Sequence, residues 1–234
     1  MIYQDISFSD PVHNLAYDDL LLQSAEKTDG GEVLRFWESP TFFVVLGKIR
    51  KINEDVKQEV VSQDKVPVLR RSSGGGTVVQ GPGCLNFTLI LSKDKHPIED
   101  LRRSYVYILE KLQAALSKLD ITTQIFPISD LALQGSAKKI SGNAQKRGKN
   151  YILHHGTVLY GFDLSMIERY LQYPNEVPEY RDKRAHLDFV TNVSMDIDRF
   201  KVQLCEQFGA QDSGNITEPD WANIDLERYS EGHF

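Results

Sequence analysis

The chain has 234 residues, of which 41% are hydrophobic and 26% charged, the composition of an ordinary globular protein. Its formal net charge of −6 argues against general affinity for nucleic acid, and no apolar stretch approaches the roughly 20 residues that span a membrane. Two cysteines, Cys84 and Cys205, form neither a metal-binding spacing nor a disulfide framework, and the N-terminus has no signal-peptide pattern. We therefore expect a cytoplasmic protein with neither a nucleic-acid nor a membrane partner.

The first half of the chain is predicted to combine short strands with three helices. The first strand covers residues 2–8, and Asp10-Pro11 then begins a helix that continues to about residue 25, because proline is favoured in a first helical turn. Further helices are expected at residues 53–63 and 98–119, the latter from its amphipathic pattern. Strands or extended segments are expected at residues 32–37, 41–46, 67–71, 77–79 and 86–91.

The second half contains short strand candidates followed by two helices. A strand that opens at Lys139 is expected to turn at Gly142. Helices are expected at 163–171 and 196–208, the second ending at Gly209. The strands are expected at residues 125–126, 131–133, 139–141 and 150–160. Strands outnumber helices without regular alternation, so we predict one α+β domain over residues 1–234.

A glycine-rich loop is the most informative segment of the chain. Arg70-Arg71 leads through two serines into Gly74–Gly76, after which β-branched residues resume. Exposed backbone N–H groups beside fixed cations suit an anionic ligand, and either arginine could bind a carboxylate or phosphate through two parallel hydrogen bonds. A glycine hairpin with solvated arginines is the alternative. The Gly-Pro-Gly turn at 81–83 and a second cationic loop downstream favour the ligand interpretation.

That second loop is centred on Lys139. It lies in the sequence Lys139-Ile-Ser-Gly142-Asn-Ala, a context that a solvated helix or strand face would not require. Lysine is a compact cation that neutralises charge developing on a transferring acyl or phosphoryl group. An exposed lysine is usually only a solubilising residue, which is our interpretation of Lys138, Lys146 and Lys149. Lys139 is therefore the candidate catalytic residue.

Several segments together resemble the lipoate–protein ligase A family, whose relatives include lipoate- and octanoate-transferring enzymes and biotin ligases. The resemblance extends over residues 11–171, and its glycine-loop and lysine motifs match the lipoate branch more closely than the biotin branch. It implies a central mixed, largely antiparallel sheet flanked by helices, with an acyl-adenylate pocket across its face. The matching stretches are residues 14–22, 34–48, 70–87, 138–147 and 151–160.

The resemblance also implies roles for individual residues. Arg70 and the Gly74–Gly76 loop would lie along the acyl chain and its activated carboxyl group, and Lys139 would contact the acyl carbonyl and the α-phosphate. Asp130 would lie near the adenosine and His155 near the acyl tail. The other residues expected to bind the substrate or adenylate are Ser73, Gly74, Gly75, Gly76, Thr77, Asn86, Gly142, Gly156 and Thr157. No residue is predicted to bind a metal.

The implied reaction attaches lipoate to the lysine of a lipoyl carrier domain, of the 2-oxoacid dehydrogenase E2 or glycine cleavage H type. Lipoate and ATP, with Mg²⁺, would form lipoyl-AMP, or preformed lipoyl-AMP would be used. The carboxylate and the α-phosphate are both anions, so cations and backbone N–H groups must offset their repulsion. A chain of about eight carbons at roughly 0.8 kcal/mol each favours octanoate or lipoate over short acids.

Three departures keep alternatives open. Gln80 stands where many relatives place histidine, and a glutamine cannot titrate. Full bacterial-type ligases carry a further C-terminal domain, which we expect this chain to lack, so activation could require a separate accessory subunit. Octanoyltransferases use a catalytic cysteine in place of ATP, but the corresponding positions, Leu153 and residues 123–126, hold none.

Two alternative functions therefore remain. The first is an octanoyltransferase that takes octanoyl groups from acyl carrier protein. Cys84 beside the glycine loop would be its candidate nucleophile, although a small buried hydrophobe is the simpler interpretation of this residue. The second is a non-catalytic lipoyl-binding scaffold. Lys139 together with both loops argues against the scaffold, because binding alone would not need the lysine.

Overall fold

The computed structural model describes residues 1–28, 31–127, 129–212 and 219–231. Its main feature is an eight-stranded sheet with the order β11-β1-β2-β6-β10-β9-β8-β7. β1 pairs in parallel with β2 and β11, and the other neighbours are antiparallel. The strands are β1 (Ile2–Asp5), β2 (Val33–Trp37), β6 (Cys84–Ser92), β7 (Thr123–Phe126), β8 (Asp130–Leu133), β9 (Lys139–Arg147), β10 (Tyr151–Leu159) and β11 (Gln211–Asp212).

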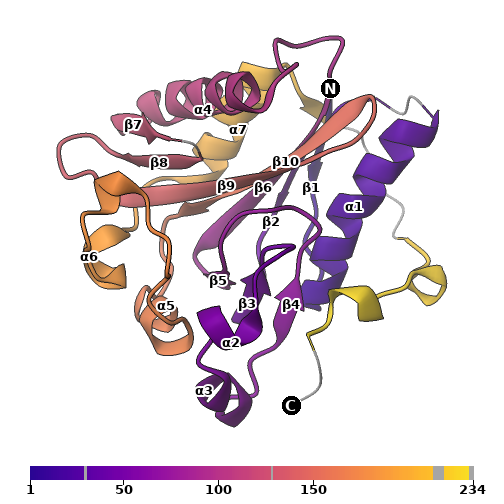
Figure 1. The fold of residues 1–234 in the computed structure, drawn as a ribbon. Coiled ribbons are helices and arrows are strands. Elements are labelled where there is room, and N and C mark those ends of the chain that lie inside the picture. The colour runs from indigo at the N-terminus through magenta and orange to yellow at the C-terminus, as the bar shows by residue number, and fades with distance from the viewer. Residues whose placement is uncertain (29–30, 128, 213–218, 232–234) are drawn as a thin grey trace.

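Helices cover both faces of this sheet (Figure 1). α4 (Leu101–Ser117) and α7 (Ile197–Phe208) pack against one face, where alternate residues such as Leu34 and Phe36 point toward them. The α7 helix is capped by Asp196 and ends at Gly209, whose φ is +62°. α1 (Pro11–Thr28) lies on the other face, against β6 and β10. No helix within the described ranges is long and apolar enough to cross a membrane.

A smaller sheet lies on the α1 side of the molecule (Figure 1). Its order is β4-β3-β5, and its residues Phe43 and Val45 share an apolar cluster with Leu15 of α1 and Trp37 of β2. A second cluster joins its opposite face to the helices that follow β10. The elements are β3 (Phe43–Leu46), α2 (Ile52–Asp55), α3 (Gln58–Gln63), β4 (Val68–Arg70), β5 (Val78–Gln80), α5 (Ser165–Tyr170) and α6 (His186–Phe189), with single 3₁₀ turns at Glu179–Arg181, Trp221–Asn223 and Glu227–Tyr229.

The α+β prediction and the mixed, largely antiparallel sheet are confirmed, but two local predictions are wrong. The helix expected at 53–63 is split, because the Lys57 N–H donates to the Tyr170 carbonyl and the Gln172 N–H to the Asp55 carbonyl. The strand that opens at Lys139 does not turn at Gly142. It continues to Arg147 because both of its edges find partners, β8 on one side and β10 on the other.

Gly156 of β10 is required by close packing across the sheet. A Cβ at this position would lie 2.0 Å from Asn143 Oδ1 and 2.6 Å from Phe87 Cζ. Asn143 cannot easily yield, because its Nδ2 donates to the Ser129 carbonyl at 2.8 Å. We expect Gly156→Ala to lower the free energy of unfolding by about 1–3 kcal/mol, measured by chemical denaturation.

The matched control for this substitution is Gly74→Ala. A Cβ at Gly74 would meet nothing within 4 Å. Its effect on stability should therefore stay within about 0.5 kcal/mol. Equal denaturation midpoints for the two variants would contradict the packing argument.

Candidate active site

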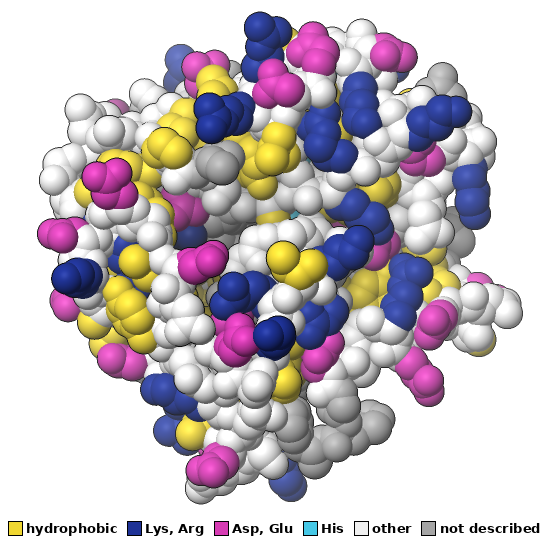
Figure 2. Space-filling view, viewed as in Figure 1, with side chains coloured by type: hydrophobic (Ala, Val, Ile, Leu, Met, Phe, Trp, Pro, Cys, Tyr) yellow, Lys and Arg dark blue, Asp and Glu magenta, His cyan; other side chains and the backbone are white. Residues whose placement is uncertain are grey.

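A cavity of about 590 Å³ lies between the two sheets, within the size range of small-molecule sites. Figure 2 shows this face of the molecule hollowed, with basic and acidic side chains beside the hollow. Three predicted site residues, Arg70, Ser73 and Gly74, are not on the cavity wall. The predicted site residues that line it are Gly75, Gly76, Thr77, Asn86, Asp130, Lys139, Gly142, His155, Gly156 and Thr157.

Lys139 enters the cavity from the first residue of β9, with 26% of its side chain exposed. Its ammonium pairs with Asp130 Oδ1 at 2.8 Å, and the Tyr180 hydroxyl donates to Asp130 Oδ2 at 2.7 Å. Gly142 makes room for the amine, since a Cβ there would lie 2.9 Å from Lys139 Nζ. The lysine is thus held in one place with its charge directed at the cavity.

Arg71, not Arg70, is the arginine that faces the cavity. Its side chain is buried, with 8% of the residue exposed, and it donates to the carbonyl oxygens of Gly74 and Gly76 at 2.6 and 2.7 Å. No carboxylate among the described residues pairs with it, and burial lowers its pKa to about 10. A buried cation without an anionic partner is costly, so this position is suited to an anionic ligand.

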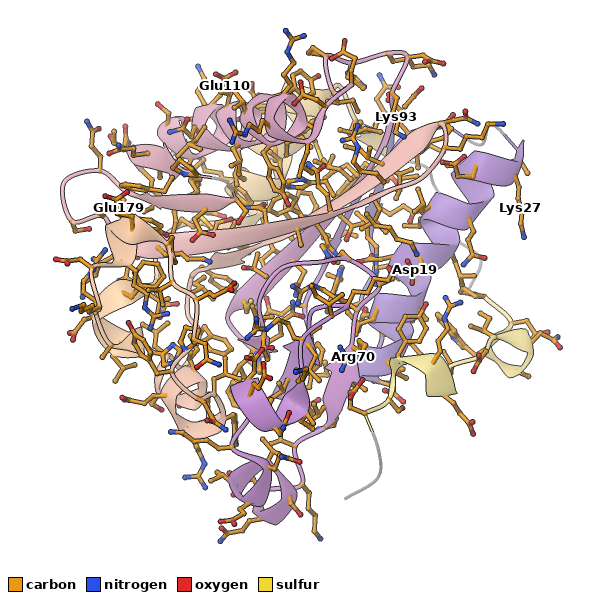
Figure 3. The ribbon with its side chains drawn as sticks, viewed as in Figure 1. Asp19, Lys27, Arg70, Lys93, Glu110 and Glu179 are labelled. Atoms are coloured by element: carbon orange, nitrogen blue, oxygen red, sulfur yellow. The ribbon has the colours of Figure 1, made fainter. Side chains whose placement is uncertain are left out.

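Arg70 points the other way and, unlike most of the predicted site residues, does not line the cavity. Its guanidinium pairs with Glu231 and donates to the carbonyls of Gly47 and Arg50 at 2.9 and 2.8 Å. Figure 3 shows it on β4 of the small sheet. Successive residues of an extended segment face opposite sides, so only one of the two arginines can reach the cavity.

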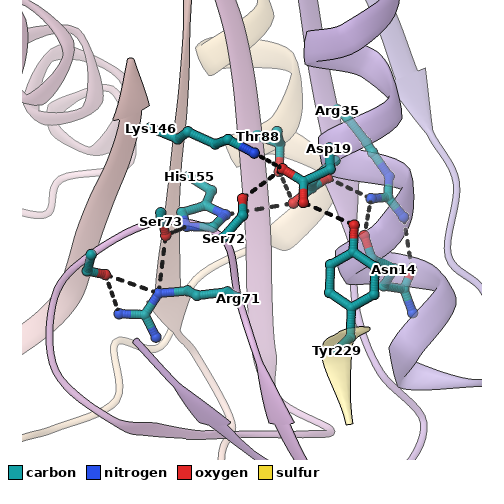
Figure 4. A network of polar contacts seen from close by, with 12 residues as sticks. Asn14, Asp19, Arg35, Arg71, Ser72, Ser73, Thr88, Lys146, His155 and Tyr229 are labelled. Atoms are coloured by element: carbon teal, nitrogen blue, oxygen red, sulfur yellow. Dashed lines mark hydrogen bonds and ion pairs between the residues drawn. The ribbon is translucent and has the colours of Figure 1, made fainter. Parts of the chain in front are cut away.

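A chain of polar contacts runs from Arg71 through Ser73 and His155 to the buried Asp18 (Figure 4). The Ser73 hydroxyl lies 3.1 Å from Arg71 Nε and 2.6 Å from His155 Nε2. His155 Nδ1 lies 3.6 Å from Asp18, which pairs with the fully buried Arg35 at 2.6 Å. Burial alone would raise the pKa of Asp18, but Arg35 and the contact with His155 together hold it below its usual value. Ser73 therefore positions Arg71 from behind the cavity wall.

The glycine loop closes tightly over this network. Gly75 has φ +88°, a conformation that favours glycine. Its carbonyl oxygen would lie 2.1 Å from a Cβ on Gly47, so the loop rests directly on the end of β3. Gly74 contributes its carbonyl to Arg71 and, unlike Gly75 and Gly76, no surface to the cavity.

The adjacent histidines face opposite sides of β10, as strand geometry requires. His155 lines the cavity, whereas His154 is fully buried among core residues. Burial lowers the pKa of His154 to about 3, so the ring is neutral. Its Nε2 lies 3.1 Å from Asn143 Oδ1, and Gln145 Nε2 lies 2.9 Å from its Nδ1. His154 is therefore structural, and of these two histidines His155 is the one available to a ligand.

Cys84 lies on the cavity wall but is only 1% exposed. Burial raises the pKa of its thiol, although a hydrogen bond with Thr157 acts in the opposite direction. A thiol held protonated is a poor nucleophile. A tenfold change in kcat for acyl transfer corresponds to about 1.4 kcal/mol of transition-state stabilisation, which a protonated thiol that does not attack the substrate would not supply. We therefore expect Cys84→Ser to change kcat by less than about threefold. A loss of several orders of magnitude would instead identify a thioester route.

Several polar lining residues were not predicted as site residues. Asn143 and Ser141 belong to the same motif as Lys139, so the motif itself was a usable signal. Arg50 and Asp55 form an ion pair on the wall, with Arg50 Nε 2.7 Å from the carboxylate. Among the described residues, no group of three or more His, Cys, Asp or Glu side chains could hold a metal ion.

A lysine and a buried arginine facing one cavity beside a mixed sheet are the features of a domain suited to an anionic ligand. Residues 10–209 match the model of the lipoyl protein ligase A/B catalytic domain, and the chain belongs to this family. It is 27% identical over 228 residues to lipoate–protein ligase 1 of Staphylococcus aureus, covering 94% of this chain and 67% of that protein. It is 32% identical over 176 residues to the mitochondrial lipoyl amidotransferase of Homo sapiens, covering 74% of this chain but 44% of that protein.

Solved structures agree with the family assignment. The bi-partite lipoate protein ligase of Thermoplasma acidophilum, described with its E2 lipoyl domain, superposes with a TM-score of 0.79 at 26% identity, covering 93% of this chain and 87% of that one. A lipoate–protein ligase A bound with ATP gives a TM-score of 0.73 at 25% identity, covering 93% and 89%. The predicted family and fold class are confirmed.

Proposed function

We propose that the protein is a lipoate–protein ligase, which attaches lipoate through lipoyl-AMP to the lysine of a carrier domain. The observation that carries this proposal is the pair of cations in one cavity, Lys139 and the buried Arg71, where Arg71 has no carboxylate partner among the described residues. A carboxylate and an α-phosphate brought together would supply the missing negative charge.

The reaction has two steps. The lipoate carboxylate attacks the α-phosphate of ATP and pyrophosphate leaves. The neutral amine of the carrier lysine then attacks the acyl carbonyl, and AMP leaves as the C–N bond forms. Lys139 offsets the negative charge that develops at the α-phosphate and then at the acyl carbonyl oxygen. The mixed anhydride hydrolyses readily, so the glycine loop above Gly47 serves to exclude water.

The acyl tail is proposed to occupy the closed end of the cavity. That end is formed by apolar side chains that are almost completely buried, among them Leu15, Trp37 and Val45. Ile49, another residue of the cavity wall, is 83% exposed, so the cavity opens to solvent beside it. A chain of about eight carbons at roughly 0.8 kcal/mol each would gain on the order of 6 kcal/mol, before costs, from entering the closed end. The carrier lysine must then approach through the open end.

Mg²⁺ is proposed to enter with ATP as part of the substrate. The carboxylates on the wall nearest the cations are already paired, Asp55 with Arg50 and Asp130 with Lys139. They are therefore not arranged as a resident metal site. Mg²⁺ commonly binds through substrate phosphates and water with few protein ligands, which fits this wall.

The proposed partner is a lipoyl domain of the 2-oxoacid dehydrogenase E2 or glycine cleavage H type, in the cytoplasm. The Thermoplasma acidophilum ligase described with its E2 lipoyl domain supports this choice. The same relative is bi-partite, so a separate accessory subunit for the activation step is part of the proposal. Cys84 and Cys205 are both free, which is compatible with the proposed reducing compartment.

Three parallel reactions with an apo lipoyl domain test the proposal, with the intact mass of that domain as the readout. The first contains lipoate, ATP and Mg²⁺, the second preformed lipoyl-AMP, and the third octanoyl-acyl carrier protein. Lipoylation in the first shows a complete ligase. Lipoylation in the second alone shows that activation needs a partner. Modification in the third alone overturns the ligase and makes Cys84 the residue to test.

A further inference from the structure

A buried carboxylate outside the cavity receives bonds from three distant parts of the chain. Asp19 of α1 is 3% exposed and does not line the cavity. Its Oδ1 accepts from the Ser72 hydroxyl at 2.5 Å and pairs with Lys146 Nζ of β9 at 2.9 Å, and its Oδ2 accepts from the Tyr229 hydroxyl at 2.8 Å (Figure 4). A buried carboxylate needs such donors, so Asp19 links α1, the start of the glycine loop, β9 and the C-terminal segment.

Tyr229 belongs to the C-terminal segment, which lies beyond the residues 10–209 that match the family model. The residue is buried, with 2% exposed. Burial and the neighbouring Asp19 carboxylate raise the pKa of Tyr229, so its hydroxyl stays protonated and donates. The next residue, Ser230, forms an antiparallel bridge with Leu69 of β4. The segment is therefore held on the small sheet by its backbone, and the hydroxyl is directed at Asp19.

Ser72 carries this contact into the glycine loop. It lies between Arg71, which lines the cavity, and Ser73, whose hydroxyl contacts Arg71 Nε at 3.1 Å. Residues 71–77 form an irregular loop, so the direction of Arg71 is not set by a sheet ladder. The Arg71 N–H is fixed by the Leu46 carbonyl at 3.0 Å. The bond from Ser72 to Asp19 is a second anchor, at the residue that separates the two side chains of the cavity network.

We propose that Asp19 and Tyr229 are positioning residues, which hold the glycine loop through Ser72 so that the Arg71 guanidinium points at the anionic ligand. Neither of the two lines the cavity, so they act through the loop and not by touching the ligand. A cation that is already fixed loses little freedom when an anion binds, whereas a cation on a loose loop must first be ordered at a cost in affinity. The choice of lipoyl-AMP as the probe rests on the proposed function.

The test is Tyr229→Phe, which removes one hydroxyl and keeps the aromatic ring. We expect equilibrium binding of lipoyl-AMP to weaken about 3- to 10-fold, the effect of one lost hydrogen bond behind the site. Hydrogen exchange at the amides of residues 72–76 should become faster, because the loop opens more often. The matched control is Tyr160→Phe, since the Tyr160 hydroxyl donates to Glu38, also at 2.8 Å, and Tyr160 does not line the cavity. The control should change neither measurement, and thermal unfolding shows that both variants are folded.

Ser72→Ala shows whether the effect passes through Asp19. Ser72 and Tyr229 bond to different oxygens of the same carboxylate, so their replacements should not be additive. We expect the double variant to bind lipoyl-AMP within about twofold of Ser72→Ala alone. Additive losses would overturn the inference, because Tyr229 would then act by another route.

Hydrogen exchange needs no ligand, so it separates this inference from the proposed function. Faster exchange in Tyr229→Phe supports the positioning role even where the wild type binds no lipoyl-AMP, a result that would reject only the proposed function. A wild type that binds lipoyl-AMP, with an affinity that Tyr229→Phe leaves unchanged, would overturn the inference and leave the ligase intact. Unchanged exchange at residues 72–76 would overturn it as well, whatever the wild type binds.

Discussion

Replacing Lys139 by alanine is expected to lower the rate of carrier lipoylation about a hundredfold, the effect of losing about 3 kcal/mol of transition-state stabilisation. The side chain is only partly buried, and among the described residues its one ion pair is with Asp130, so its loss should leave the fold intact. Single-turnover transfer from preformed lipoyl-AMP measures the loss directly, since it removes the activation step from the rate.

Lys138→Ala is the matched control for this substitution. Lys138 is the preceding residue and is not on the cavity wall. Its replacement removes the same charge from the chain, so transfer should stay close to the wild-type rate. Equal losses for the two variants would point to a general electrostatic effect and contradict a specific role for Lys139. Lys139→Ala that still binds lipoyl-AMP but transfers nothing would also reject the scaffold alternative.

The ion pair with the Asp130 carboxylate holds the Lys139 ammonium in the cavity before a substrate binds. Asp130 accepts from Tyr180, whose ring stacks on Phe126 with centroids 4.0 Å apart. Burial and the nearby Asp130 carboxylate raise the pKa of Tyr180, so its hydroxyl stays a donor. One oxygen of Asp130 therefore accepts from Tyr180, and the other pairs with the ammonium of Lys139. The site needs no rearrangement of long side chains to present its cation.

The sequence predicted those parts of the site whose residues stand together along the chain. Lys139 and Gly142 belong to one short motif, and the structure brings them into contact because the lysine lies across the glycine. Of the two adjacent histidines only His155 was expected near a ligand, and alternation along the strand places it on the cavity wall and His154 in the core. Local patterns thus identified the residue types and much of their placement.

The choice between Arg70 and Arg71 could not be made from local pattern. Both adjoin the same strand, and only the surroundings decide which one faces the ligand. Glu231, 161 residues further on, pairs with Arg70 and holds it outside the cavity. Similarly, no helix or strand and no site residue was predicted at residues 173–179, yet Pro174, Glu176 and Pro178 form part of the cavity wall. Irregular segments carry no periodicity from which their position could be inferred.

Arg71→Lys is expected to weaken binding of lipoyl-AMP about 10- to 100-fold, the range for losing charge-assisted hydrogen bonds of about 1.5–3 kcal/mol. The charge is kept, but a single ammonium cannot donate to the Gly74 and Gly76 carbonyls and to a ligand in the fork geometry that arginine provides. Equilibrium binding of lipoyl-AMP, with thermal unfolding measured in parallel, tests this expectation.

Arg70→Lys makes the comparison decisive because the two arginines are neighbours with different partners. Arg70 holds backbone carbonyls of residues 47–50, so its replacement should cost about 1 kcal/mol of stability and leave the affinity for lipoyl-AMP nearly unchanged. Arg71→Lys should instead weaken the binding of lipoyl-AMP, since the Arg71 guanidinium faces the cavity without a carboxylate partner among the described residues. If Arg70→Lys weakened ligand binding and Arg71→Lys did not, the anion would bind on the other side of the strand. The cavity between the two sheets would then not be the binding site of the adenylate.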